Sequence, residues 1–188
     1  MNGVHYTCYI KNIEHSIETK EKPKMNIEVS SDHLTMNGVT YKCAVGKGGI
    51  RANKKEGDKA TPVGTFPIRR VFYRPDRIEK PDTPFETVAL SKQDGWSDDL
   101  TRPEYNQLIT LPYSGSHEEL WREDHLYDVI VELGYNDDPP IPGKGSAIFM
   151  HVASETYSPT AGCIVLSLPD LLEILKKSTL ETKISISG

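Results

Sequence analysis

The chain has 188 residues, which suits one sizeable hydrophobic core and leaves little room for a second domain. Its 22 lysines and arginines face 27 aspartates and glutamates, so the net charge is −5 and there is no basic surplus to bind nucleic acid. No apolar run of about 18 residues occurs, which excludes a membrane-spanning helix.

Short segments of alternating apolar residues dominate the chain and predict strands. The first lies at Val4–Ile10. The alternation over Val39–Val45 predicts one arm of a hairpin, with Leu34–Met36 as the other arm and Asn37-Gly38 as the turn. Further strands are predicted at Met25–Val29, Gly64–Ile68, Asp128–Leu133, Ala147–His151, Ile164–Leu166 and Lys183–Ile186.

Two segments predict helices. Ser167 has the position of an N-cap before an amphipathic segment that ends at Lys177. Ser116 and Glu119 have the spacing of a capping box, which predicts a short helix at His117–Glu123. The apolar face expected for the longer helix consists of Leu168, Leu171, Leu172 and Leu175.

The whole chain is interpreted as a single domain spanning residues 1–188, with residues 1–24 as an N-terminal extension. No internal repeat or linker divides it. The long stretch Arg69–Gln107 has no clear periodicity, but its aromatic residues predict an ordered segment. The predicted fold class is mainly β, a sandwich or barrel with one or two short helices.

The strongest chemical signal is a histidine followed by a cysteine in the last third of the chain. A buried strand is expected to end at His151, and a loop then leads to Gly162-Cys163 and a second apolar run. If the two strands are neighbours, the imidazole lies within hydrogen-bond reach of the thiol and takes its proton, as a cysteine nucleophile requires. The N–H groups of Gly162 and Cys163 are candidate donors to an oxyanion.

A structural role is the alternative for each of the three cysteines, because free cysteines are commonly buried as small apolar groups. Cys8 and Cys43 alternate with apolar neighbours, and we interpret both as core residues. The pattern around Cys163 leaves the two roles equally open. Three cysteines cannot all pair, and none has C-x-x-C spacing, so neither a disulfide framework nor a zinc site is expected.

One more segment completes a recognisable pattern. Gly57–Phe66 reads GDKATPVGTF and is followed by His151 and then by Gly162-Cys163. In this order the three motifs resemble the catalytic domain of the YkuD-type L,D-transpeptidases, in the variant with a Pro-Thr-Ala-Gly-Cys motif, over roughly residues 39–186.

The resemblance implies a β-sandwich and peptidoglycan cross-linking. It assigns Cys163 as the nucleophile that forms a thioester with a stem peptide, His151 as the base, and Gly162 with Cys163 as oxyanion donors. An amine of a neighbouring stem peptide then resolves the thioester. Thr61–Phe66 matches a structural hairpin of the family. No cofactor is implied.

The sequence also departs from the commoner family motif, Ser-His-Gly-Cys followed two residues later by a polar residue. Thr160-Ala161 replaces the first two residues, and Val165 replaces the polar residue. Arg122 is our candidate for the missing polar contact, as a bidentate partner of a substrate carboxylate; the alternative is a solvated surface arginine. Thr160, Tyr127 and His117 are the other candidates for substrate binding.

A metal site is tempting near His117 and His125, which lie among acidic residues. The spacing does not fit H-E-x-x-H, because Trp121 stands where the second histidine is needed. We therefore expect no metal.

Three functions are compatible with the sequence. The first is a peptidoglycan L,D-transpeptidase; the second is an L,D-carboxypeptidase, in which water resolves the same thioester; the third is a non-catalytic peptidoglycan-binding module. We expect a monomer whose partners are stem peptides, and rapid alkylation of Cys163 near neutral pH. The family suggests the periplasm or cell envelope, whereas the charged first twenty residues lack a signal-peptide pattern and leave the cytoplasm as the alternative.

Overall fold

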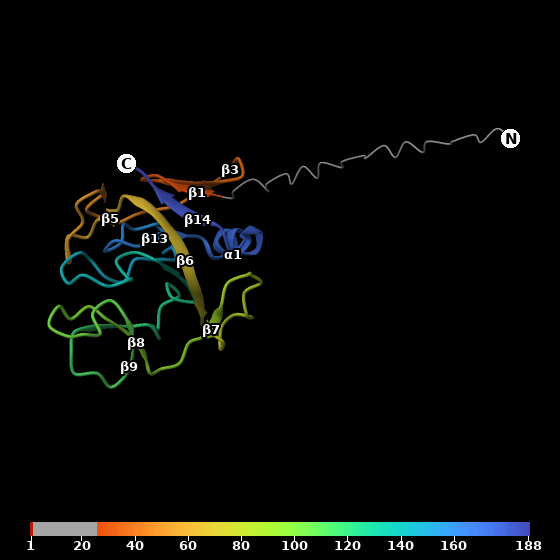
Figure 1. The fold of residues 1–188 in the computed structure, drawn as a ribbon. Coiled ribbons are helices and arrows are strands. Elements are labelled where there is room, and N and C mark those ends of the chain that lie inside the picture. Colours follow the sequence, from red (N-terminus) through yellow and green to blue (C-terminus); the bar gives the residue numbers. More distant parts are fainter. Residues whose placement is uncertain (2–25) are drawn as a thin grey trace.

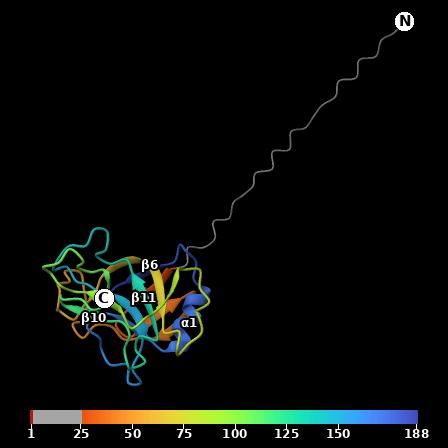
Figure 2. The same ribbon diagram turned by 90° about the horizontal axis from the view of Figure 1, so that it is seen from below.

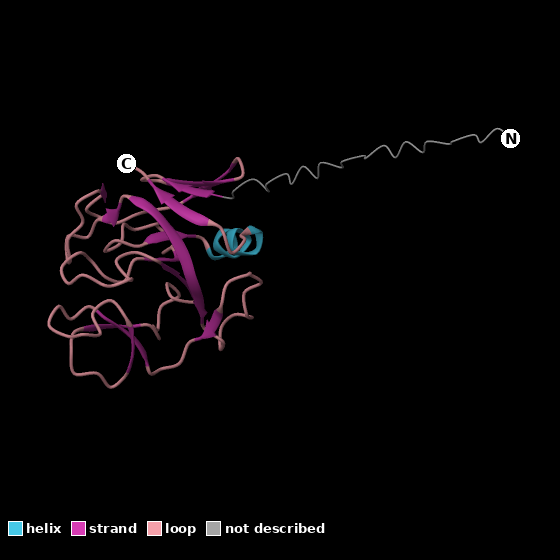
Figure 3. Cartoon of the chain, viewed as in Figure 1, coloured by secondary structure: helices cyan, strands magenta, loops and turns pink. Residues whose placement is uncertain are grey.

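The computed structural model describes Met1 and residues 26–188 of the chain. The predicted strand Val4–Ile10, with Cys8, lies outside the described residues. Strands and loops make up almost all of the described part (Figure 3). Within it, no helix has the length and apolar character needed to cross a membrane.

The principal element is a nine-stranded mixed sheet (Figure 1). Its order is β13-β12-β11-β6-β14-β1-β2-β3, and β7 pairs with β6 beside this path. The strands span Asn26–Val29 (β1), His33–Met36 (β2), Val39–Lys42 (β3), Gly64–Tyr73 (β6), Thr87–Ala89 (β7), Val129–Leu133 (β11), Phe149–Val152 (β12), Ile164–Leu166 (β13) and Lys183–Ile186 (β14).

The sheet curls until its two ends meet. The long strand β6 pairs with β14 along its first half and with β11 along its second, and β6 and β11 lie side by side in Figure 2. A β-bridge between Ala44 and Val165 then joins the segment after β3 to β13 at the opposite edge. The result is the barrel-like or sandwich-like body that the alternating sequence pattern predicts.

Adjacent residues of the sheet enter two different cores, because successive side chains of a strand point to opposite faces. Met150 and Ile164 belong to a large aliphatic cluster, whereas Phe149 and Cys163 belong to a smaller aromatic cluster. Helix α1 (Leu168–Lys177) covers the aliphatic side. The aromatic side also contains Phe72, Leu90, Trp96, Leu120, Tyr127 and Ile130.

The predicted C-terminal helix is confirmed, including its cap. The Ser167 hydroxyl accepts a hydrogen bond from the Asp170 N–H, as an N-cap does. Its apolar face is shifted slightly from the prediction. Ile174 is fully buried with Leu171 and Leu175, whereas Leu168 and Leu172 are only partly buried.

A small second sheet covers the aromatic core. Its order is β10-β8-β9, and in Figure 1 it lies apart from the main sheet at the lower end of β6. The remaining two strands, β4 and β5, form a short parallel pair. The bounds are Ile50–Arg51 (β4), Thr61–Pro62 (β5), Asp94–Ser97 (β8), Leu108–Thr110 (β9) and His117–Glu119 (β10).

The predicted short helix at His117–Glu123 is wrong. Its first three residues form β10, which pairs antiparallel with β8. The Ser116 N–H donates to the Asp99 carboxylate, so the segment is held by tertiary contacts rather than by a capping box. Ladder hydrogen bonds to β8 therefore outweigh a local helix signal that a segment this short cannot sustain.

Several strand boundaries also differ from the prediction. The strand predicted over Val39–Val45 ends at Lys42, that predicted at Ala147–His151 begins at Phe149, and that predicted at Gly64–Ile68 continues to Tyr73. The stretch Arg69–Gln107 is ordered, as expected. Among its aromatic residues, Phe85, Trp96 and Tyr105 are buried.

Candidate active site

Two neighbouring strands bring the predicted nucleophile and base to one face of the sheet. β12 and β13 are parallel, and His151 pairs in register with Val165. Cys163 lies two residues before Val165, so alternation puts both on the face that His151 occupies. Their immediate neighbours Met150 and Ile164, which pair with each other, belong to the aliphatic core on the opposite face.

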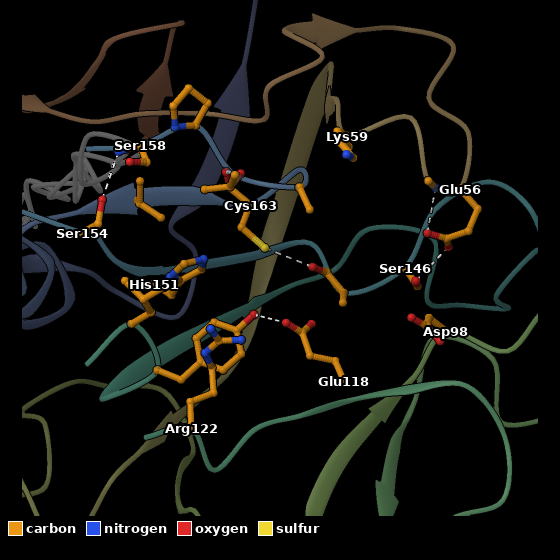
Figure 4. Close-up of a pocket in the computed structure, with 18 residues that line it drawn as sticks. Glu56, Lys59, Asp98, Glu118, Arg122, Ser146, His151, Ser154, Ser158 and Cys163 are labelled. Carbon is orange, nitrogen blue, oxygen red and sulfur yellow. Dashed lines mark hydrogen bonds between the residues drawn. The ribbon is translucent and has the colours of Figure 1, made fainter. Parts of the chain in front are cut away.

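This face forms the floor of a pocket of about 390 Å³. Figure 4 shows the Cys163 sulfur directed into it, with His151 and Arg122 on one side and Glu118, Asp98 and Glu56 on the other. The pocket is lined by Glu56, Gly57, Lys59, Asp98, Glu118, Arg122, Leu126, Tyr127, Ser146, Ala147, His151, Ser154, Ser158, Pro159, Thr160, Ala161, Cys163 and Val165.

The Cys163 thiol is nearly buried, with 8% of the residue exposed. Its Sγ donates to the Ala147 carbonyl oxygen at 3.2 Å and accepts from the Phe149 N–H at 3.5 Å. Burial raises the pKa of Cys163 to about 12, and the negative charge of Glu118 adds to the rise. The resting residue is therefore a thiol.

His151 is also buried and uncharged. Burial lowers its pKa to about 4. Nδ1 lies 3.0 Å from the Val152 carbonyl oxygen, which only accepts, so Nδ1 carries the proton and Nε2 is left as the basic nitrogen. The ring packs edge-on against Tyr127, with 4.9 Å between ring centroids.

The expected direct contact between thiol and imidazole is not made in this resting arrangement. Within residues 26–188, the hydrogen bonds of Cys163 Sγ go to Ala147 and Phe149 rather than to His151. The pair is a thiol and a neutral imidazole, not a thiolate and an imidazolium. The raised pKa of Cys163 instead predicts slow alkylation near neutral pH, because only the thiolate reacts well.

The loop before Cys163 is held by two threonines. The Thr61 hydroxyl accepts from the Gly46 N–H at 2.8 Å and donates to the Gly162 carbonyl oxygen at 2.8 Å. Gly162 has φ +145, and a Cβ there would lie 2.9 Å from the Ala60 carbonyl oxygen, so this close approach requires glycine.

The Gly162 N–H, an expected oxyanion donor, points to another partner. It donates to the Thr160 hydroxyl at 3.0 Å, and that hydroxyl donates to the Cys163 carbonyl oxygen at 2.6 Å. Thr160 lines the pocket and at the same time holds the turn. The resting loop thus leaves the Gly162 N–H engaged within the loop itself.

Comparison with known proteins shows the family of the chain. The model of the YkuD family, described as the L,D-transpeptidase catalytic domain, matches residues 26–186. The chain belongs to the YkuD family.

A solved structure resembles this YkuD domain more distantly. It is the crystal structure of Mycobacterium tuberculosis L,D-transpeptidase 1, with 15% sequence identity and a TM-score of 0.40. The match covers 88% of this chain and 60% of that chain, so the YkuD domain spans less than two thirds of the other protein's length. The comparison with curated proteins returned no match.

Only some of the candidate substrate-binding residues of the YkuD domain line the pocket. Tyr127 and Arg122 line the pocket, with the guanidinium 5.1 Å from the centroid of the Tyr127 ring. Arg122 is neither free nor fully solvated. Its Nε and one terminal nitrogen bind Asp124 at 2.9 and 2.6 Å, so the bidentate fork predicted for a substrate carboxylate is already occupied.

His117 is placed outside the pocket lining. Its Nδ1 lies 2.8 Å from the Gly115 carbonyl oxygen, and its ring packs edge-on against Tyr113. His125 instead pairs with Asp128 at 2.7 Å. Both histidines of this segment thus have local structural contacts.

The acidic side of the pocket was missed from the sequence. The Glu118 carboxylate accepts a hydrogen bond from the Tyr127 hydroxyl at 2.5 Å, and burial raises the pKa of Glu118. Glu56 accepts from Tyr105 at 2.6 Å and from Ser146 at 2.8 Å. No local sequence spacing predicts these residues as part of the site. Glu118 was assigned to a helix, although it lies on a strand.

Proposed function

We propose that this YkuD domain is a peptidoglycan L,D-transpeptidase that works by cysteine acyl transfer. The observation that carries the proposal is the placement of Cys163 and His151 on one sheet face, at the floor of a pocket. They occupy the positions of the nucleophile and base in the family motif. We place the reaction in the bacterial periplasm or cell envelope, where peptidoglycan lies.

The first half-reaction follows from the protonation states. Nδ1 of His151 keeps its proton on Val152, so Nε2 accepts the Sγ proton as the sulfur attacks the carbonyl carbon of an L-configured residue. The carbon–nitrogen bond to the following residue breaks, and the imidazolium returns the proton to the leaving amine. The product is a thioester on Cys163.

The oxyanion of the tetrahedral intermediate needs hydrogen-bond donors near the sulfur. The Cys163 N–H, directly before β13, is the first candidate donor. The Gly162 N–H joins it once the Thr160 hydroxyl releases it. Each such donor contributes about 3 kcal/mol of transition-state stabilisation in comparable sites.

The second half-reaction transfers the acyl group to an amine of a neighbouring stem peptide. The thioester carbon–sulfur bond breaks, an amide bond forms, and the thiol is restored. The first half-reaction is the same whether water or an amine attacks the thioester. An amine acceptor gives transpeptidation, and water gives carboxypeptidation.

The test is incubation of the protein with a defined tetrapeptide muropeptide, with the products separated by chromatography and weighed by mass spectrometry. We expect a cross-linked dimer and a Cys163 thioester on the intact protein. Tripeptide without dimer would assign the carboxypeptidase instead. Absence of any Cys163-dependent product would leave the non-catalytic binding module.

A further inference from the structure

The acidic side of the pocket contains two carboxylates, one on β10 and one directly after β8. Glu118 on β10 pairs in register with Trp96 on β8, and Asp98 lies two residues beyond Trp96. Alternation therefore directs Glu118 and Asp98 to the same face. Both residues line the same pocket, and after burial the negative charge of Asp98 also raises the pKa of Glu118.

These two carboxylates have no cationic partner among residues 26–188. No ion pair of the described chain includes either residue. Arg122, whose positive charge lowers the pKa of Glu118, forms its ion pair with Asp124. Lys59 also lines the pocket, and in Figure 4 it lies beyond the sulfur from Glu118.

Asp98 supplies a second observation. Its Oδ1 is buried and has no hydrogen-bond partner in the described part of the chain. A buried carboxylate oxygen without a donor is costly, and a cation in the pocket beside the partly exposed Asp98 would offset that cost by neutralising the carboxylate charge. Glu56, the third carboxylate here, differs because Tyr105, Ser146 and the Gly57 N–H already satisfy it.

We propose that Glu118 and Asp98 bind the ammonium group of the acceptor stem peptide, and that Glu118 removes its proton before it attacks the thioester on Cys163. The inference rests on the proposed acyl transfer and assigns its second half-reaction. His151 accepts the proton of the thiol on one side of the sulfur, and Glu118 accepts the proton of the acceptor ammonium on the other side (Figure 4).

The proton balance of this step is complete. The ammonium gives one proton to the Glu118 carboxylate and becomes a neutral amine. The amine nitrogen then forms the amide bond as the carbon–sulfur bond breaks, and its second proton passes to the leaving sulfur. Glu118 finally releases its proton to solvent. Burial keeps the Glu118 pKa above its ordinary value, which makes the carboxylate a stronger base for this task.

The decisive variant is Glu118→Gln, because it keeps the size of the side chain and removes its charge. We expect thioester formation from the donor tetrapeptide within a few-fold of wild type, and resolution of the thioester by the amine slowed about 100-fold. The thioester then accumulates on the intact protein, as mass spectrometry measures. Asp98→Asn should mainly raise KM for the acceptor amine.

The matched control is Glu119→Gln, which removes the same charge from the exposed neighbouring residue of β10 and should leave both steps unchanged. Hydroxylamine, an acceptor that is largely uncharged at neutral pH, supplies a second measurement. It should resolve the thioester of the Glu118→Gln protein about as fast as that of wild type, and the formation of that thioester shows that the variant is folded.

Two results would overturn the inference while leaving the proposed function standing. One is resolution by the stem-peptide amine at the wild-type rate in Glu118→Gln. The other is equal slowing with hydroxylamine and with the stem-peptide amine. Failure of the proposed function is distinguishable from both, because wild-type protein would then form either no thioester at all or tripeptide without a cross-linked dimer.

Discussion

The two free cysteines of the described chain lie in similar electrostatic surroundings and in different structural ones. Cys43 and Cys163 are 3% and 8% exposed, and burial raises the pKa of each to about 12. Cys43 follows β3 in the aliphatic core, where its Sγ donates to the Ser30 carbonyl oxygen at 3.8 Å. Cys163 lies in the aromatic core at the floor of the pocket.

The two cysteines do not differ in their protonation state. They differ because only Cys163 lines a pocket and has a base on its own sheet face. A thiol of raised pKa reacts poorly unless a neighbouring group removes its proton during the attack. Cys163 has the neutral His151 on its own sheet face, whereas Cys43 is enclosed by side chains such as Val29 and Leu34. The pocket side of the sheet is thus suited to chemistry and the helix side to stability.

The largest expected effect separates the two cysteines directly. Replacing Cys163 with Ser should lower muropeptide turnover at least about a thousandfold, because the thioester cannot form. Replacing Cys43 with Ser should leave turnover per folded molecule unchanged, although it puts a hydroxyl in the core. Turnover assays normalised to folded protein measure both. Equal losses in the two variants would refute the comparison.

The next effect concerns alkylation and pH. With a pKa of about 12, each thiol should react with iodoacetamide about a thousandfold more slowly at neutral pH than in the unfolded chain, whose ordinary value is 9.0. The rate at Cys163 should rise about tenfold per pH unit, because the thiolate fraction does. Peptide mapping after timed labelling gives each rate. A stem peptide should protect Cys163 and not Cys43, and a pH-independent rate at Cys163 would contradict the assigned thiol.

The same pKa shifts make a statement about stability. A thiol whose folded pKa is raised stabilises the fold fully below the unfolded pKa of about 9 and loses this contribution as pH rises toward 12. His151 works in the opposite direction. Its lowered pKa leaves the fold fully stabilised above its ordinary 6.5 and less stable as pH falls toward 4.

The third effect tests the base. Replacing His151 with Gln should lower kcat about a hundredfold or more, because the thiol proton then has no acceptor. The wild-type rate of thioester formation should hold as pH falls from 7 to 5, since the imidazole stays neutral down to a pKa of about 4. Single-turnover kinetics of thioester formation across this range measure the profile. An acid limb near the ordinary histidine value of 6.5 would show a solvated His151 instead.

The smallest effect on chemistry, and a clear effect on stability, is expected at the loop anchor. Replacing Thr61 with Val removes hydrogen bonds to the Gly46 N–H and the Gly162 carbonyl oxygen, at a cost of about 1–3 kcal/mol in the free energy of unfolding. Thr65 is the matched control, since it is exposed and its hydroxyl contacts Ser185. Urea unfolding measures both variants, and equal midpoints would contradict the anchoring role.

Much of the site could be predicted because it depends on local pattern. The apolar runs around His151 and Cys163 predicted two neighbouring strands, and Ser167 predicted the start of α1. Each signal is carried by a few consecutive residues, so a single sequence contains it. The family resemblance gave Thr61–Phe66 a scaffolding role, and the structure adds that the Thr61 hydroxyl holds the cysteine loop.

The acidic side of the pocket could not be predicted in this way. Glu118 was assigned to a helix on the spacing of Ser116 and Glu119, and Asp98 belonged to a stretch without periodicity. Only the pairing of β10 with β8 brings the two carboxylates together. That pairing joins segments about twenty residues apart and leaves no periodic trace in either.

The sequence by itself determined the mainly β fold, the capped helix and the order of histidine and cysteine, because alternation and capping act between near neighbours. Tertiary structure alone decided the protonation states of Cys163 and His151, the pairing of Arg122 with Asp124 and the position of Glu118 across the pocket. The physical reason is that burial and charge fields depend on which distant segments pack together, and spacing along a chain does not encode that distance.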